Sequence, residues 1–141
     1  MMRVVLDTSV MVAAARSRRG ASFAIVQMIP ERRFEVCLSV GLYMEWVSVL
    51  TRRDNLPPDI TSQKALGFLR HLASLSHLQD IHYLWRPFLP DPDDDMVLEL
   101  AFAADCKYIV TYNHRDFRGS EQLGILTISP ADFLKQLQNQ T

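Results

Sequence analysis

The sequence lacks the features that hold small secreted proteins together or anchor proteins in membranes. Its two cysteines, Cys37 and Cys106, lie far apart and belong to no CxxC pair, so we expect two buried free thiols and neither a disulfide scaffold nor a zinc or redox site. Five glycines and seven prolines in 141 residues are too few for a collagen-like or disordered chain. The longest apolar run, residues 10–15, is far shorter than the roughly 20 residues of a membrane-spanning helix. Without a secretory leader, a cytoplasmic protein with no membrane partner is expected.

The amino-acid composition, with 48% hydrophobic and 22% charged residues, suits one compact domain spanning residues 1–141. The formal net charge of −1 gives no sign of a nucleic-acid partner by itself. The charge is unevenly distributed, because residues 1–70 hold ten Lys or Arg against six Asp or Glu, and residues 71–141 hold five against ten. An acidic cluster in the second half therefore faces a more basic first half.

Strand patterns alternate with helix patterns along the chain. Residues 3–7, RVVLD, hold a continuous apolar run without alternation, which is typical of a parallel strand covered on both faces. Further strands are expected at 34–39, 81–84, 108–111 and 124–128, and helices at 10–16, 21–29, 40–53, 61–78, 95–104 and 130–138. This alternation predicts an α/β fold, a three-layer α/β/α sandwich with a central, mainly parallel sheet of about five strands.

Acidic and amide side chains recur where the expected strands end and the following helices begin. In right-handed βα units these points share one edge of the sheet. The side chains placed at this edge are Asp7, Glu45, the pair Asp94 and Asp95, and the pair Asn113 and Asp116. We therefore expect residues from distant parts of the sequence to converge there.

Glu45 is the least ordinary of these acids, because its helix is apolar nearly all round and Leu42 and Val49 share its face. A buried carboxylate without a partner is costly, and repulsion from Asp7 and Asp95 would raise that cost unless a multivalent cation neutralised it. An oxygen-only ligand set without clustered His or Cys suits Mg²⁺ or Mn²⁺ far better than Zn²⁺. The sequence thus predicts a Mg²⁺ or Mn²⁺ site.

A cation held by carboxylates has a common use in phosphodiester hydrolysis. It lowers the pKa of a bound water, orients that water in line with the phosphorus, and neutralises charge in the transition state. Arg16, Arg18 and Arg19 follow the first strand, and we expect them near the same edge as phosphate contacts. His114, beside Asn113, is a further candidate substrate contact. Hydrolysis of a nucleic acid is the reaction this combination favours.

At this point the sequence resembles a known family, the PIN-domain nucleases, over essentially the whole chain. Within that family it is similar to the toxin components of bacterial type II toxin–antitoxin pairs, the VapC-like group. The segments that carry the resemblance, in order, are VVLDTSV at 4–10, Glu45 in the third helix, DPDDDMVLELA at 91–101, YIVTYNHRDF at 108–117 and SPADFL at 129–134.

The resemblance implies that Asp7, Glu45 and Asp95 hold the cation, with Asp94 as the alternative third acid. The family often has Asp where this chain has Asn113, with Asp116 three residues later. The number of metal ions and the identity of the fourth ligand therefore stay open.

The resemblance also implies endonucleolytic cleavage of RNA, a homodimer and inhibition by a small cognate antitoxin. Ser9 would hydrogen-bond a metal-bound water or a phosphate. Two alternatives remain: a PIN-fold protein that has lost catalysis, beginning at Asn113, and now binds RNA or protein, and a nuclease directed at DNA or at a particular nucleic-acid structure. Purely structural roles are also open, as a helix cap for Asp7, an arginine partner for Glu45 and a turn for Asp116.

Overall fold

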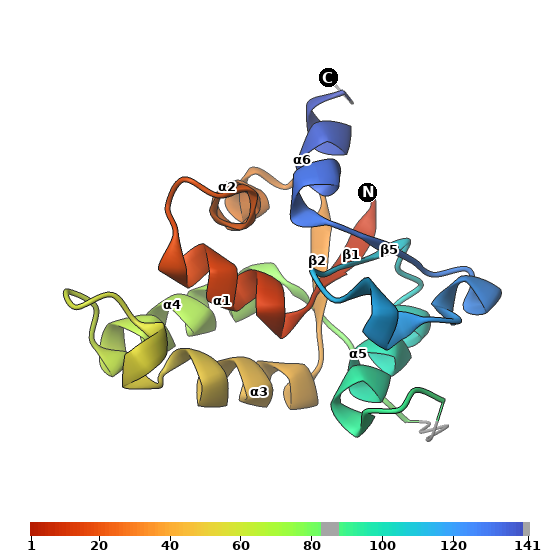
Figure 1. The fold of residues 1–141 in the computed structure, drawn as a ribbon, viewed down its shortest axis with the longest axis horizontal. Helices are drawn as coiled ribbons and strands as arrows, with labels where there is room; N and C mark the ends of the chain where they lie inside the picture. The colour runs from red at the N-terminus through yellow and green to blue at the C-terminus, as the bar shows by residue number, and fades with distance from the viewer. Residues whose placement is uncertain (83–87, 140–141) are drawn as a thin grey trace.

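The computed structural model describes residues 1–82 and 88–139 (Figure 1). Five strands form one sheet in the order β3-β2-β1-β4-β5, and all four pairings are parallel. The strands are β1 (Arg3–Leu6), β2 (Glu35–Leu38), β3 (His77–Leu78), β4 (Tyr108–Val110) and β5 (Leu126–Ile128). The predicted α/β architecture with a parallel five-stranded sheet is confirmed.

Helices lie on both faces of the sheet, as the strand order requires. The chain moves outward from β1 to β3 and then returns to β4, so right-handed crossovers put α5 on the face opposite to α1–α4. α5 packs against β1, β2 and β4, while α6 packs against α2 (Figure 1). The helices are α1 (Thr8–Arg16), α2 (Ala21–Met28), α3 (Val40–Leu50), α4 (Ser62–Leu75), α5 (Pro92–Ala103) and α6 (Pro130–Gln138), with short 3-10 helices η1 (Ile29–Glu31), η2 (Arg53–Asn55), η3 (His114–Phe117) and η4 (Ser120–Leu123).

The core explains the apolar run at the start of the chain. Val4, Val5 and Leu6 of β1 have no exposed surface, because β1 lies between β2 and β4 and is covered by helices on both faces. The two cysteines are free and buried, as expected. Although distant in sequence, the two thiols interact, and this interaction lowers the pKa of Cys37 and raises that of Cys106.

Several element boundaries differ from the expected ones. The expectation of a strand at 81–84 is wrong for residues 81 and 82, and residues 83 and 84 lie outside the described residues. The third strand is His77–Leu78, which pairs with Cys37 and Leu38 of β2. Sequence periodicity assigns these two residues to the preceding helix, but that helix ends at Leu75 because Ser76 is extended. The end of this helix is decided by the pairing of residues 77 and 78 with a distant strand, which helical periodicity in the sequence does not reveal.

Helix α5 begins three residues earlier than expected, at Pro92. The carboxylate of Asp91 accepts a hydrogen bond of 2.9 Å from the backbone N–H of Asp93 and caps the helix, and Pro92 occupies a first-turn position that needs no N–H donor. Asp93, Asp94 and Asp95 therefore all lie in the first turn. Within residues 1–82 and 88–139, no helix has both the length and the apolar character to span a bilayer.

Candidate active site

Asp7 lies at the carboxyl edge of the sheet, by which we mean the edge where the strands end and the following helices begin. β1 and β4 are neighbours with Leu6 opposite Val110, so the next residues, Asp7 and Thr111, stand side by side. The Thr111 hydroxyl donates to Asp7 Oδ2 at 2.7 Å and the Ser9 hydroxyl to the same oxygen at 3.0 Å. With 7% exposure, Asp7 is a buried carboxylate fixed by two hydroxyl donors. Its side chain makes no cap bond to α1, so the structure does not give it the alternative role of helix cap.

Glu45 reaches this edge from α3. The hydroxyl of Thr8 donates to Glu45 Oε2 at 2.5 Å, which ties α3 to the start of α1. Burial raises the pKa of Glu45, the Thr8 hydrogen bond lowers it, and the charges of Asp93, Asp7 and Asp91 raise it further. The hydrogen-bond partner of Glu45 is thus a threonine hydroxyl. Among the described residues, no arginine forms the ion pair with Glu45 that the sequence left open. The carboxylate faces other acids.

Asp94 and Asp95 have different surroundings although they are adjacent in α5. Asp94 is partly buried, and its pKa is raised to about 7, first by desolvation and then by the negative charges of Asp116, Asp91, Asp7 and Asp93. Asp95 is 1% exposed. Its Oδ1 accepts the backbone N–H of Leu89 at 2.8 Å, and both of its oxygens lie within 3.3 Å of the backbone N of Phe88. Asp95 therefore holds the chain before α5, while Asp94 joins the acidic group.

We expect Asp95→Ala to destabilise the protein by about 2–4 kcal/mol, because it removes a buried carboxylate that accepts from the buried N–H of Leu89 and from the partly buried N–H of Phe88. Asp94→Ala serves as the matched control, since it removes a carboxylate that repels its neighbours, and it should not lower stability. Urea unfolding at neutral pH without divalent cations measures both. Equal losses for the two variants would contradict the structural role assigned to Asp95.

The segment after β4 brings Asn113, His114 and Asp116 to the carboxyl edge. All three are exposed. The backbone N–H of Asn113 donates to Thr111 Oγ1 at 2.9 Å, and His114 Nδ1 lies 2.9 Å from Thr127 Oγ1 in β5. Asp116 is close enough to Asp94 to raise its pKa, while its backbone N–H closes a turn onto Asn113 O at 3.0 Å. Either Asn113 or Asp116 can thus supply an oxygen beside the buried acids.

The acidic group consists of Asp7, Glu45, Asp94 and Asp116. In the part of the chain that the structure describes, no three His, Cys, Asp or Glu side chains stand close enough to share a metal ion. The members of the acidic group are nonetheless electrostatically coupled, because the charge of Asp7 raises the pKa of both Glu45 and Asp94. Crowded oxygen ligands of one sign fit a hard divalent cation, whose charge would remove the repulsion. The donor set is thus compatible with Mg²⁺ or Mn²⁺.

We expect Asp94→Asn to stabilise the metal-free protein above pH 7 and to leave its stability unchanged near pH 4. The folded chain keeps the Asp94 proton up to a pKa of about 7, against an ordinary value of 3.8, so ionisation of this carboxyl destabilises the fold as the pH rises between the two. Because the side chain is partly exposed, solvent screening limits the gain to about 1–2 kcal/mol. Thermal unfolding in EDTA at the two pH extremes measures the difference, and equal gains at both would contradict the repulsion.

The arginines expected at this edge lie elsewhere. Arg16 ends α1, whose nine residues carry the chain about 13 Å from Asp7, and its guanidinium donates to Asn55 Oδ1 at 2.7 Å. Arg18 lies 3.9 Å from Asp59, with both side chains more than 70% exposed. Arg19 is also exposed in the loop after α1. The expectation that these three lie beside the acids is wrong, because a helix of this length carries them away. Contact with a longer nucleic acid stays a prediction.

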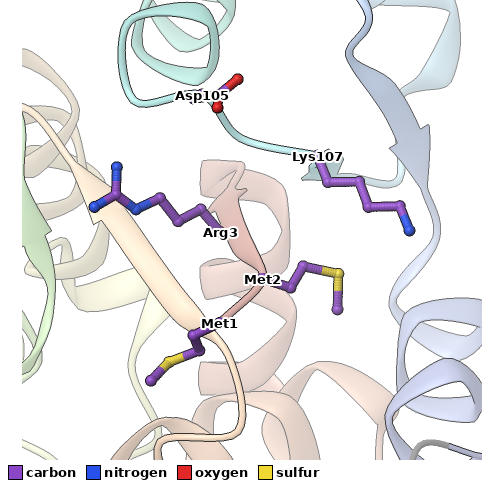
Figure 2. Close-up of a pocket in the computed structure, with 5 residues that line it drawn as sticks. All are labelled: Met1, Met2, Arg3, Asp105 and Lys107. Carbon is purple, nitrogen blue, oxygen red and sulfur yellow. The ribbon is translucent and has the colours of Figure 1, made fainter.

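A pocket of about 400 Å³ lies at the opposite edge of the sheet, where the strands begin. Figure 2 shows that the side chains of Arg3 and Lys107 extend in different directions from it. Arg3 is already paired with Glu35 at 2.8 Å and donates to the carbonyl of Ala104. This pocket therefore offers no converging charge, in contrast to the carboxyl edge.

An apolar groove of about 550 Å³ runs between α1, α2, α4 and the end of α3. The residues that shape it are mostly aliphatic or aromatic, and the described lining residues include no acid. Arg18, Lys64 and His71 add positive or titratable groups. Examples of the apolar lining residues are Ala15, Phe23, Val26, Leu56, Ala65 and Phe68. Phe68 is 50% exposed, so the groove presents aromatic surface to solvent.

A family model described as a PIN domain matches residues 3–115, which include Asp7, Glu45 and Asp94 of the acidic group and end one residue before Asp116. The chain belongs to the PIN-domain family. No curated protein matches the sequence.

Two solved structures share the fold of this PIN domain. DNA-bound VapBC from Salmonella typhimurium is 16% identical with a TM-score of 0.63, and the match covers 92% of this chain and 99% of that chain. VapBC2 from Rickettsia felis, bound to a DNA fragment from its promoter, is 12% identical with a TM-score of 0.60, and the match covers 91% and 98%.

Sequence analysis did not single out two hydroxyl residues of this PIN domain that hold the acids. Thr8 binds Glu45 and Thr111 binds Asp7. Both threonines stand in the quoted motifs, but nothing local distinguishes them from other threonines near strand ends. Knowing that β1 and β4 are neighbours would have identified Thr111, since that pairing puts it opposite Asp7.

Proposed function

We propose that this PIN domain is an endoribonuclease that depends on Mg²⁺ or Mn²⁺ and acts in the cytoplasm as the toxin of a toxin–antitoxin pair. The observation that carries the proposal is the convergence of Asp7, Glu45 and Asp94 on one edge of the sheet, with Asp7 in place to repel both of the others. Charges of one sign that come together from three elements are costly for the fold alone. A bound cation would neutralise these charges and would bind the phosphates of a polyanionic substrate.

Asp7, Glu45 and Asp94 would hold the cation, and Asn113 or Asp116 would provide a fourth oxygen. The bound cation would activate a water molecule and neutralise charge on the phosphate during cleavage. Thr111 and Thr8 keep the carboxylates of Asp7 and Glu45 oriented. Asp95, taken from the resemblance as the third ligand, serves in this proposal to position the residues before α5.

Ser9 and His114 are proposed to contact the substrate. Ser9 Oγ already donates to Asp7, so its oxygen remains available to accept a hydrogen bond from a water near the cation. His114 is exposed and held by Thr127, which leaves its other ring nitrogen free to approach a phosphate or a ribose hydroxyl.

The test is incubation of the purified protein with single-stranded RNA and with DNA, in Mg²⁺, Mn²⁺ or EDTA. We expect internal cleavage of RNA with either metal and none in EDTA. Cleavage of DNA alone would instead support the DNA-directed nuclease. Binding of RNA without cleavage under any of these conditions would support the degenerate PIN-fold module, for which the replacement of an acid by Asn113 is the specific argument.

The antitoxin is proposed to bind in the apolar groove between α1, α2 and α4. Both fold relatives are, by their titles, VapBC assemblies bound to DNA. The groove's apolar lining with Arg18 and Lys64 suits an amphipathic helix that carries acidic residues. A homodimer stays a prediction, and light scattering of the isolated protein tests it.

A further inference from the structure

Tyr112 is an exposed aromatic residue directly beside the acidic group. It follows Thr111, whose hydroxyl binds Asp7, and its backbone N–H points at Ser9 Oγ at 3.5 Å. Ser9 donates to the same Asp7 oxygen. The backbone of Tyr112 is therefore connected to the Asp7 carboxylate through hydroxyl groups on two sides.

The ring of Tyr112 is fixed at its far end. Its hydroxyl lies 2.7 Å from Ser22 Oγ in α2, and Ser22 is 1% exposed. A buried hydroxyl thus holds the phenol oxygen, while half of the residue, 50%, remains open to solvent. The tethered ring therefore presents an ordered aromatic surface beside the acidic group, open to a ligand that stacks on it.

We infer that the Tyr112 ring is a stacking platform for a nucleobase next to the phosphate that is cleaved. The inference rests on the proposed nuclease function. A base offers a flat π face to any aromatic ring, and stacking on proteins is the usual way to hold unpaired RNA. Because Ser22 already orders the ring, little conformational entropy is lost when a base packs on it. The substrate class is accordingly single-stranded RNA, whose bases are free to stack.

Stacking at Tyr112 predicts a specific pattern of KM and kcat values among variants. Removing the ring in Tyr112→Ala should raise KM about 5- to 150-fold, as expected for the loss of one base stack, with kcat unchanged because the contact lies beside the reacting phosphate and not on it. Tyr112→Trp should retain affinity. Tyr112→Phe and Ser22→Ala keep the ring but lose its tether, so they should raise KM by only about 2- to 5-fold.

Phe102→Ala provides the matched control. Phe102 is also about half exposed, at 51%, but it lies in the last turn of α5, which leads to the edge where β4 begins. Loss of this ring should leave KM and kcat unchanged. Thermal unfolding of all variants in EDTA separates folding defects from binding defects.

Photocrosslinking gives a readout that does not depend on cleavage. Single-stranded RNA containing thiouridine is irradiated with the wild-type protein in EDTA, and the crosslinked tryptic peptide is identified by mass spectrometry. We expect the crosslink on Tyr112 in peptide 108–115, and its loss in Tyr112→Ala. If RNA is cleaved but Tyr112→Ala has wild-type KM and the crosslink lies elsewhere, the stacking role is overturned and the nuclease stands.

Two further outcomes are equally decisive. If RNA crosslinks to Tyr112 and no metal gives cleavage, the nuclease proposal fails while the stacking platform stands as a binding feature. If Tyr112→Ala weakens binding of the antitoxin or self-association and leaves RNA cleavage unchanged, Tyr112 is a protein contact and the inference is wrong.

Discussion

Asp7→Asn is expected to lower kcat/KM for RNA cleavage by about 100- to 1000-fold, which corresponds to several kcal/mol of lost electrostatic stabilisation by the metal. The substitution keeps the size of the side chain and one acceptor oxygen for Ser9 or Thr111 but removes the charge that Glu45 and Asp94 both sense. Initial rates on a labelled single-stranded RNA with Mn²⁺ measure the effect.

Asp105→Asn is the matched control for this variant. Asp105 is exposed at the edge where β4 begins, and its φ of 56° is a left-handed conformation that asparagine tolerates. The Asp105→Asn variant should cleave RNA at the wild-type rate. Asp7→Asn should also be at least as stable as wild type in EDTA, because one of several repelling charges is gone. Wild-type cleavage by Asp7→Asn would show that the observed nuclease activity does not need this carboxylate.

Phe68→Asp is expected to weaken binding of the cognate antitoxin by about 100-fold or more, since it replaces an aromatic contact by a charge that would be buried in an apolar interface without a partner. Phe68 is half exposed in α4, so the isolated protein should fold normally. Calorimetric titration with the cognate antitoxin measures the change. RNA cleavage by the free variant should be unchanged, because the groove does not include the acidic group.

Gln63→Asp tests whether an added negative charge on α4 is sufficient. Gln63 is exposed on the same helix and does not line the groove. It should bind the antitoxin with an affinity close to that of the wild type. Equal weakening by both variants would point to a general electrostatic effect and against docking in the groove, and no weakening by Phe68→Asp would place the antitoxin on another surface.

The arrangement of the acids was largely predictable from the sequence. Asp7 and Glu45 follow strong strand patterns, and the rule that parallel strands end at one edge brings them together without any knowledge of packing. The choice between Asp94 and Asp95 could not be made in this way. Adjacent residues of a helix point about 100° apart, and which of them faces the acids depends on where α5 docks and on which backbone groups need an acceptor.

Local patterns therefore determined most elements, the parallel sheet, and the edge at which the acidic side chains gather, because hydrophobic periodicity, capping and crossover handedness act over short stretches of chain. Tertiary structure alone decided that Asp95 binds the backbone of Phe88 and Leu89, that Thr8 and Thr111 hold the acids, and that Arg16, Arg18 and Arg19 stand apart from them. The threonine contacts join residues distant in sequence, and the Asp95 bonds depend on where α5 docks, because a buried polar group must find its partner in three dimensions.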